Sequence, residues 1–172
     1  MNRTKRLTLT GIFAGLGFAL MFLEFPIFPQ ATFLKYDPSD IPALILTLNL
    51  GYTAGITVVL VKDILFYFAK SGDIVGIAMN ALAGIVFVSL SKLFWSTTFK
   101  SRLIASVIVG SGVTTVMLGA NAIVVPMYFK APFDVFLKFL PFIIAFNLVK
   151  FIVDFHVGAL IDDRLRFVLR LG

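Results

Sequence analysis

Long apolar stretches separated by short polar breaks dominate this chain, and their lengths predict its elements. A helix needs about 20 apolar residues to cross the core of a bilayer. Several stretches reach that length, and we predict membrane helices over about residues 7–25, 74–94 and 103–125 and from about residue 141 onward. The first of them is too long for the apolar part of a secretory signal, so we expect it to stay in the mature chain.

The stretch at residues 41–69 is long for one membrane span and short for two. Lysine and arginine concentrate in cytoplasmic loops. A single pass would place Lys92, Lys100 and Arg102 outside the cell, whereas two passes place them on the side of the basic N-terminus and the C-terminal arginines. Those arginines are Arg164, Arg166 and Arg170. We therefore predict two helices with a break near residues 49–51, the first of them about ten residues long.

The resulting fold is an all-α integral membrane protein: a six-transmembrane-helix bundle with cytoplasmic N- and C-termini and a short second helix. Ten helical residues cannot cross a core of roughly 30 Å unaided, so a neighbour or the preceding loop must complete the layer. We expect residues 1–172 to form one membrane-embedded domain.

Composition agrees with a membrane protein and excludes several classes. Hydrophobic residues make up 59% of the chain and charged residues only 14%, whereas about a quarter of an ordinary globular domain is charged. Cytoplasmic loops account for the net charge of +6, so we expect no nucleic-acid partner. The chain has no cysteine and one histidine, which leaves little for a metal site.

Polar groups interrupt the last apolar stretch, between Pro141 and His156. On a helix, Asn147, Lys150 and Asp154 fall within an arc of roughly 60°, while His156 points away from them. A lysine inside a membrane costs about 3 kcal/mol on insertion scales, so it usually faces a cavity, a partner or a ligand. Two interpretations stay open: the polar end of a ligand pocket, or an ion pair of Lys150 with Asp154 closed on itself.

Further polar residues lie in the other predicted spans. Asn80, spaced four residues from Gly76 and Gly84, suits either a hydrogen bond between helices or a ligand contact. Asn121, near the outer end of its helix, is predicted to share the depth of Lys150. Lys62 is adjacent to Asp63 and so faces another side of its helix; burial and snorkelling are both open for it.

The loop at residues 26–40 has three prolines and several aromatic side chains. It is too apolar for a solvated linker, and we interpret it as a lid over a site or as an interfacial anchor. Ser39 and Asp40, just before Ile41 and Pro42, predict a helix start with a capping side chain. Residues 131–136 form a second apolar outer loop in this interpretation.

Gly11, Gly15 and Ala19 recur every four residues in the first predicted helix. Such a stripe of small residues lets another helix approach closely. The other helix belongs either to a partner subunit or to this chain.

The sequence lacks common nucleotide-binding and catalytic motifs. It has no phosphate-binding GxxxxGK[ST] loop, so it does not by itself hydrolyse ATP in the usual way. It has no HExxH, no GxSxG and no paired carboxylates on one predicted face, so we expect no enzyme activity. A channel filter is absent, and six short spans are few for a self-sufficient transporter.

The chain has a family resemblance that covers nearly its whole length and rests on four segments. They are Lys5 to Leu9, Leu20 to Pro26, Leu34 to Leu44 and Pro141 to Lys150. The chain resembles the substrate-binding S-components of energy-coupling factor (ECF) transporters, and within them the riboflavin-binding RibU branch. The Asp-x-Ser-Asp-Ile-Pro-Ala-Leu and Phe-Asn-Leu-x-Lys pieces are the specific ones.

The resemblance implies a multi-pass protein of the prokaryotic cell membrane with a vitamin pocket near its outer surface. It implies that Asn121, Asn147 and Lys150 hydrogen-bond riboflavin, which is the transported ligand and not a cofactor. The first loop would cover the pocket and contribute contacts from Phe33, Leu34 and Lys35. Asn80 completes the set of ligand residues that we predict.

The resemblance also implies partners. S-components dock on a coupling transmembrane subunit that works with two cytoplasmic ATPases, usually through an Ala-xxx-Ala stripe, which Gly11, Gly15 and Ala19 replace here. The implied function is high-affinity riboflavin binding as the specificity component of an ECF-type ABC transporter. The alternatives are an S-component for thiamine or pantothenate and, from a different class, a small lipid-modifying membrane enzyme that uses Lys150 and Asp154.

Overall fold

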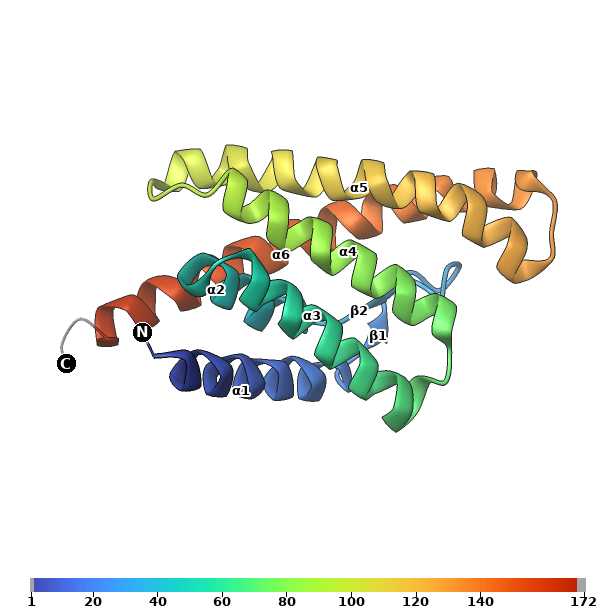
Figure 1. Cartoon of the computed structure of the whole chain (residues 1–172). Helices are drawn as coiled ribbons and strands as arrows, with labels where there is room; N and C mark the ends of the chain where they lie inside the picture. The colour runs from blue at the N-terminus through green and yellow to red at the C-terminus, as the bar shows by residue number, and fades with distance from the viewer. Residues whose placement is uncertain (1, 170–172) are drawn as a thin grey trace.

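The apolar stretches form helices that lie side by side in an elongated bundle in the computed structural model (Figure 1). The structure describes residues 2–169, except for the side chains of residues 71 and 166–169. The described chain forms α1 (Arg3–Met21), α2 (Asp40–Leu50), α3 (Tyr52–Phe66), α4 (Ile74–Leu93), α5 (Phe99–Phe129) and α6 (Phe133–Leu169). A π-helical turn, η1 (Tyr67–Ser71), extends α3. The prediction of six helices with a short second one is confirmed.

A small antiparallel hairpin connects α1 to α2. Its strands are β1 (Phe25–Pro26) and β2 (Lys35–Tyr36), with Phe25 opposite Tyr36. The hairpin, η1 and the α5–α6 turn lie toward one end of the bundle, here called the hairpin end (Figure 1). The start of α1 and the last turns of α6 lie toward the other end, here called the terminal end.

Four helical segments are long and apolar enough to cross a membrane by length and composition. They are Tyr52–Lys70, Ile74–Leu93, Phe99–Phe129 and Phe133–Leu165. Helix α2 has only 11 residues, and α1 begins with the basic residues Arg3, Lys5 and Arg6. Among the described helices, length and hydropathy therefore identify four membrane spans. They do not identify α1 and α2 as spans.

The break between α2 and α3 falls at Gly51, as predicted. Its φ of 96° lies in a region that side chains disfavour and glycine adopts freely. The last carbonyls of α2 find cationic partners: Lys92 Nζ lies 2.9 Å from the oxygen of Thr47, and Arg6 donates to the oxygen of Leu50 at 3.0 Å. The Thr47 oxygen also accepts from the Gly51 N–H at 3.0 Å, and cations at the C-terminal end of a helix interact favourably with its dipole.

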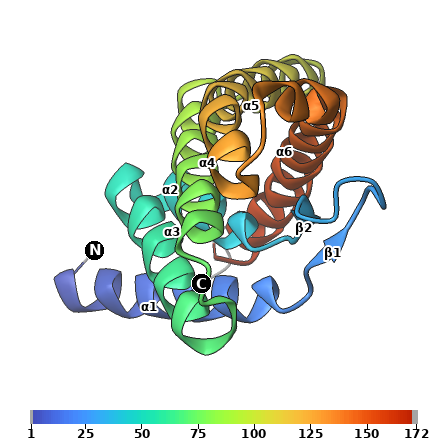
Figure 2. The same cartoon turned by 90° about the vertical axis from the view of Figure 1, so that its right-hand side faces the viewer.

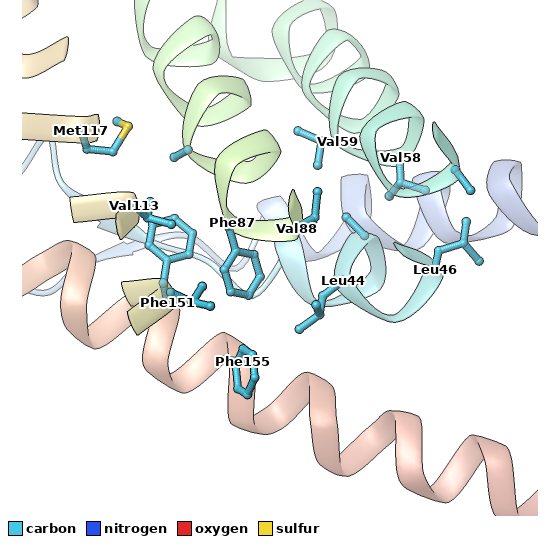
Figure 3. Packing of buried hydrophobic residues seen from close by; sticks show 14 of the residues in the cluster. Leu44, Leu46, Val58, Val59, Phe87, Val88, Val113, Met117, Phe151 and Phe155 are labelled. Carbon is cyan, nitrogen blue, oxygen red and sulfur yellow. The ribbon is translucent and has the colours of Figure 1, made fainter. Parts of the chain in front are cut away.

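Short as it is, α2 lies at the centre of the bundle. Its residues from Asp40 to Thr47 are all buried, by packing against α1, α3, α4 and α6. Leu44 of α2 belongs to the main hydrophobic core, in which Phe87 of α4 and Phe151 of α6 lie with ring centres 5.0 Å apart (Figure 3). Neighbouring helices thus complete the layer that α2 cannot span.

Three predicted boundaries were wrong. Helix α1 ends at Met21 rather than Phe25, because Phe25 pairs in the hairpin. Helix α6 begins at Phe133 and continues through Pro141, and α5 continues through Pro126, so the predicted outer loop at 131–136 shrinks to a tight turn. A proline removes one backbone hydrogen bond, but apolar surroundings favour a helix because they leave its other backbone groups no water to bind.

Residues 27–34 of the hairpin loop pack on the last two helices. Ala31 and Leu34 are buried in a second apolar cluster with residues of α5 and α6, including Val125 and Ile143. The ring of Phe33 meets that of Phe139 edge-on at 5.1 Å. The loop is therefore a packed element over the hairpin end, which favours a lid over an interfacial anchor.

Candidate ligand-binding site

A cavity of about 490 Å³ lies between the hairpin loop and the helices at the hairpin end. Aromatic and aliphatic side chains from Met21, Phe66, Met117, Phe146 and Phe151 form much of its wall. All seven residues predicted to bind ligand also line it: Phe33, Leu34, Lys35, Asn80, Asn121, Asn147 and Lys150. The structure thus brings together residues from one loop and three helices, and their role in binding stays a prediction.

Two of the lining asparagines are held in the same way by their own helices. Asn147 donates to the carbonyl of Ile143 and Asn121 to that of Met117, each at 2.8 Å. Both side chains are buried. An amide that gives one hydrogen to its helix keeps a second hydrogen and an oxygen with which to meet a ligand. Asn121 and Lys150, which were predicted to share a depth, line the same cavity.

The Lys150 ammonium is fixed by acidic groups from three elements. Its Nζ donates to the backbone oxygen of Asp37 at 2.6 Å. Carboxylate oxygens of Asp37, Asp40 and Asp154 lie 3.5, 3.4 and 3.6 Å away. The pair with Asp154 therefore exists, but the interpretation that it is closed on itself is wrong. A lysine so paired is also poorly suited to act as a free base, which disfavours the enzyme alternative.

Tyr36 and Asp37 of the hairpin belong to this polar cluster, and sequence analysis missed them. The Tyr36 hydroxyl donates to Asp154 Oδ1 at 3.0 Å. Burial and the nearby Asp154 charge raise the pKa of the Tyr36 phenol, so it stays a donor. Burial alone would raise the pKa of Asp37, but the ammonium groups of Lys150 and Lys62 outweigh it and lower that pKa. The one signal in the sequence was their place within a segment that carries the family resemblance.

Asp40 also acts differently from the prediction of a helix cap. Helix α2 starts at Asp40, and the Ser39 side chain makes no capping bond. Asp37 Oδ1 instead accepts from the Ser39 backbone N–H at 3.0 Å. The Asp40 carboxylate is fully buried and faces two lysines, Lys62 and Lys150. Sequence spacing identified the helix start but not this ionic role.

Lys62, whose burial the sequence left open, is fully buried. Its Nζ lies 2.9 Å from Asp63 Oδ1 and 3.2 Å from Asp40 Oδ1. The expectation that Lys62 and Asp63 diverge was wrong, because the flexible lysine stem reaches back to its neighbour. Asn80 donates to Asp63 Oδ1 at 2.9 Å, so it makes the predicted bond between helices and lines the cavity as well.

Charged groups surround the rim of the cavity. Glu24, three residues after the end of α1, pairs with Lys35 of β2 at 2.9 Å and with Lys70 of η1 at 3.1 Å. The Lys70 ammonium also lies 5.5 Å from the ring centres of Phe22 and Phe66. These contacts join the loop to α1 and α3 at the rim.

His156 lies off the polar face of α6, as predicted. Its Nε2 is 3.0 Å from Ser106 Oγ of α5, and it is not among the described residues that line the cavity. Among the described residues, no group of three or more His, Cys, Asp or Glu side chains could hold a metal ion.

The stripe of Gly11, Gly15 and Ala19 is exposed on α1. A methyl group added at Gly11 or Gly15 would meet nothing within 4 Å. Ala14 and Gly17, on the other side of the helix, are buried instead. The alternative that the stripe packs within this chain is therefore wrong for the described residues.

The arrangement suits a flat, largely apolar ligand with a polar edge. Apolar and aromatic walls bury most of such a molecule, and a few convergent polar groups fix its orientation. Here Asn80, Asn121, Asn147 and Lys150 supply polar groups from three helices.

Comparisons with known proteins show the family of this chain. Residues 5–161 match the family described as "ECF transporter, substrate-specific component". The chain is 31% identical to the riboflavin transporter RibU of Streptococcus thermophilus, over 98% of this chain and 86% of that protein. It is 30% identical to the riboflavin transporter FmnP of Bacillus subtilis, over 95% and 93% of the two chains.

A solved structure of the S component of a bacterial ECF transporter has the same fold. It superposes with a TM-score of 0.86 at 32% identity and covers 98% of this chain and 99% of that one. Because sequence and fold both match over nearly the whole chain, this protein belongs to the family of substrate-specific components of ECF transporters and is a multi-pass protein of the prokaryotic cell membrane.

Proposed function

We propose that this chain is the riboflavin-binding component of an ECF-type transporter and that it supplies specificity, not chemistry. The observation that carries the proposal is that Asn121, Asn147 and Lys150 line one cavity together with several aromatic side chains. Riboflavin has a flat ring with a polar edge and a hydroxylated tail, which fits such a site. Its relatives in two bacteria are named riboflavin transporters, and members of the family are transporter components rather than enzymes.

In this proposal the polar edge of the flavin ring meets Asn147 and Lys150 on α6, with Asn121 on α5 and Asn80 on α4 beside it. Phe33, Leu34 and Lys35 of the hairpin loop cover the ring. A cavity of about 490 Å³ is within the usual range for sites that bury a small ligand.

The proposed topology has six membrane spans, with α1 and α2 crossing in company with their neighbours. Arg3, Lys5 and Arg6 begin α1 at the terminal end, and Lys92 and Arg102 flank the α4–α5 connection. Positive residues favour the cytoplasm, so both ends of the chain are cytoplasmic and the cavity lies toward the outside.

The exposed stripe of Gly11, Gly15 and Ala19 is the proposed docking surface for the coupling transmembrane subunit, which two cytoplasmic ATPases energise. An open face of small residues allows close approach of a partner helix. The ligand residues lie away from this stripe, so docking and binding can be altered separately.

A titration of the purified protein tests the ligand. We expect riboflavin fluorescence to be quenched saturably on binding, and an excess of thiamine or pantothenate to leave it quenched. Displacement by either vitamin, or lack of quenching by a folded protein, would contradict riboflavin as the ligand.

A further inference from the structure

A chain of buried charges runs behind the cavity from one wall to another. It starts at Lys150 on α6, passes to Asp40 on α2 and then to Lys62 on α3. From Lys62 it continues through Asp63 to Asn80 on α4. The two ends, Lys150 and Asn80, line the cavity, whereas the three residues between them are not among the described lining residues.

Asp40 is the junction of this chain. One carboxylate oxygen lies 3.2 Å from Lys62 Nζ and the other 3.4 Å from Lys150 Nζ. Both Asp40 and Lys62 have no exposed surface. Charges buried away from water interact strongly. Lys62 neutralises part of the Asp40 charge and thereby sets how strongly Asp40 attracts Lys150.

The surrounding backbone is shaped to fit these two side chains. A methyl group at Gly84 of α4 would lie 2.9 Å from Asp40 Oδ1. At Gly17 of α1 it would lie 3.1 Å from the Lys62 stem. Glycine at both positions therefore leaves the room that this ion pair occupies.

Asp40, which is not among the described residues that line the cavity, attracts the Lys150 ammonium on one side. Lys62 draws Asp40 in the opposite direction, and the Asn80–Asp63 hydrogen bond ties Lys62 and its neighbour to α4. The pair thus restrains the Lys150 ammonium from outside the described cavity lining.

We propose that Asp40 and Lys62 are positioning residues, which hold the Lys150 ammonium where the ligand meets it without touching the ligand. The inference rests on the proposed function, because it takes Lys150 as a contact of riboflavin. It assigns a role in binding to Asp40 and Lys62, which are not among the described residues that line the cavity.

The test compares parent, Lys150→Met, the double variant Asp40→Asn/Lys62→Met, and the triple variant that combines all three changes. The double variant removes one negative and one positive charge, so it keeps the net charge of the cluster. Asp63 loses the Lys62 ammonium in this variant but keeps its hydrogen bond from Asn80. Thermal unfolding of each purified protein checks that it folds. Fluorescence quenching gives the affinity for riboflavin.

We expect the double variant to bind at least about tenfold more weakly than the parent, although it touches no ligand. The triple variant should bind no more than about threefold more weakly than Lys150→Met, because the pair acts through Lys150. The absorption band of the bound flavin in the double variant should shift toward that in Lys150→Met. Lys92→Met is the matched control, since Lys92 also contacts α2, through the oxygen of Thr47. The Lys92→Met protein should bind riboflavin with the affinity of the parent.

Parental affinity in the folded double variant would overturn this proposal alone. So would a loss in the triple variant equal to the sum of the losses in the double variant and in Lys150→Met. No riboflavin binding by the folded parent would overturn the proposed ligand, and this proposal with it.

Discussion

The Tyr36 hydroxyl of the hairpin donates a hydrogen bond to Asp154 of α6, 118 residues later in the chain, at 3.0 Å. Among the described residues, it is one of two hydrogen bonds that connect Tyr36 and Asp37 to the α6 turn at Lys150 and Asp154, beside the ion pair of Lys150 with the Asp37 carboxylate. The other runs from Lys150 Nζ to the backbone oxygen of Asp37. The covering loop is therefore joined to the same helix turn that we propose to contact the ligand.

Removal of the Tyr36 hydroxyl should loosen the loop. Hydrogen bonds to charged groups contribute about 1.5–3 kcal/mol, so we expect Tyr36→Phe to release riboflavin roughly tenfold faster, or more. Stopped-flow recovery of flavin fluorescence measures this rate. Tyr52→Phe, at the start of α3 and outside the described cavity lining, should release it at the parental rate. Equal rates for Tyr36→Phe and parent would show that the bond does not hold the loop.

Asp37 should make the fold sensitive to acid. Lys150 and Lys62 lower its pKa from the usual 3.8 in spite of burial. Such a carboxyl stabilises the fold above its unfolded-state pKa, and that contribution is lost as the pH falls through the lower folded-state pKa. We expect the Tm of the parent to decrease as the pH is lowered below about 4. The Tm of Asp37→Asn should be lower than that of the parent at neutral pH and should change less with pH. Asp134→Asn, an exposed carboxyl at the start of α6, should follow the parent.

The polar wall of the cavity should carry much of the affinity. Asn147→Ala or Lys150→Ala would leave polar ligand atoms without partners, at a cost of about 1–3 kcal/mol, or roughly ten- to a hundredfold in Kd. His156→Ala is the control on the other face of α6 and should bind as the parent does. A Lys150→Ala protein with parental Kd would remove the lysine from the proposed site.

The two sides of α1 should respond differently to a bulky residue. Gly15 faces open space, so Gly15→Leu should fold and bind riboflavin normally but fail to support uptake in cells. Gly17 faces Lys62 and the Ser39 oxygen, with a methyl group already 3.1 and 3.2 Å from them, so Gly17→Leu should fold poorly. Normal uptake by Gly15→Leu would remove the stripe from docking.

Reporter fusions can test the proposed orientation. A fusion after Gly72, beside η1 at the hairpin end, should report the outside, and one after Phe99, at the start of α5, should report the cytoplasm. The same location for both would contradict the pass of α4 through the membrane. An outside report after Phe99 would contradict the positive-inside argument for the whole topology.

Local features of the sequence predicted the helices well, and the long-range contacts less well. The break at Gly51 and the polar face with Asn147 and Lys150 depend on a few consecutive residues, through backbone preference and helix period. Pro141 misled the prediction of where α6 starts, because the helix continues through it. Helix faces did not predict the ion pair of Lys62 with Asp63, because a flexible lysine side chain reaches beyond the face on which it starts.

The sequence by itself determined the membrane class, the number of helices, the short second helix and seven of the residues that line the cavity. Hydropathy, charge placement, helix period and the segments that carry the family resemblance are all properties of residues near one another in the chain. Only the tertiary structure decided the partners of Lys150, since Asp37 is 113 residues away and Asp40 lies on another helix. It alone showed that Lys62 is buried and that Gly11 and Gly15 face outward. Burial and charge pairing depend on which helices meet in space, and spacing along the chain does not specify that.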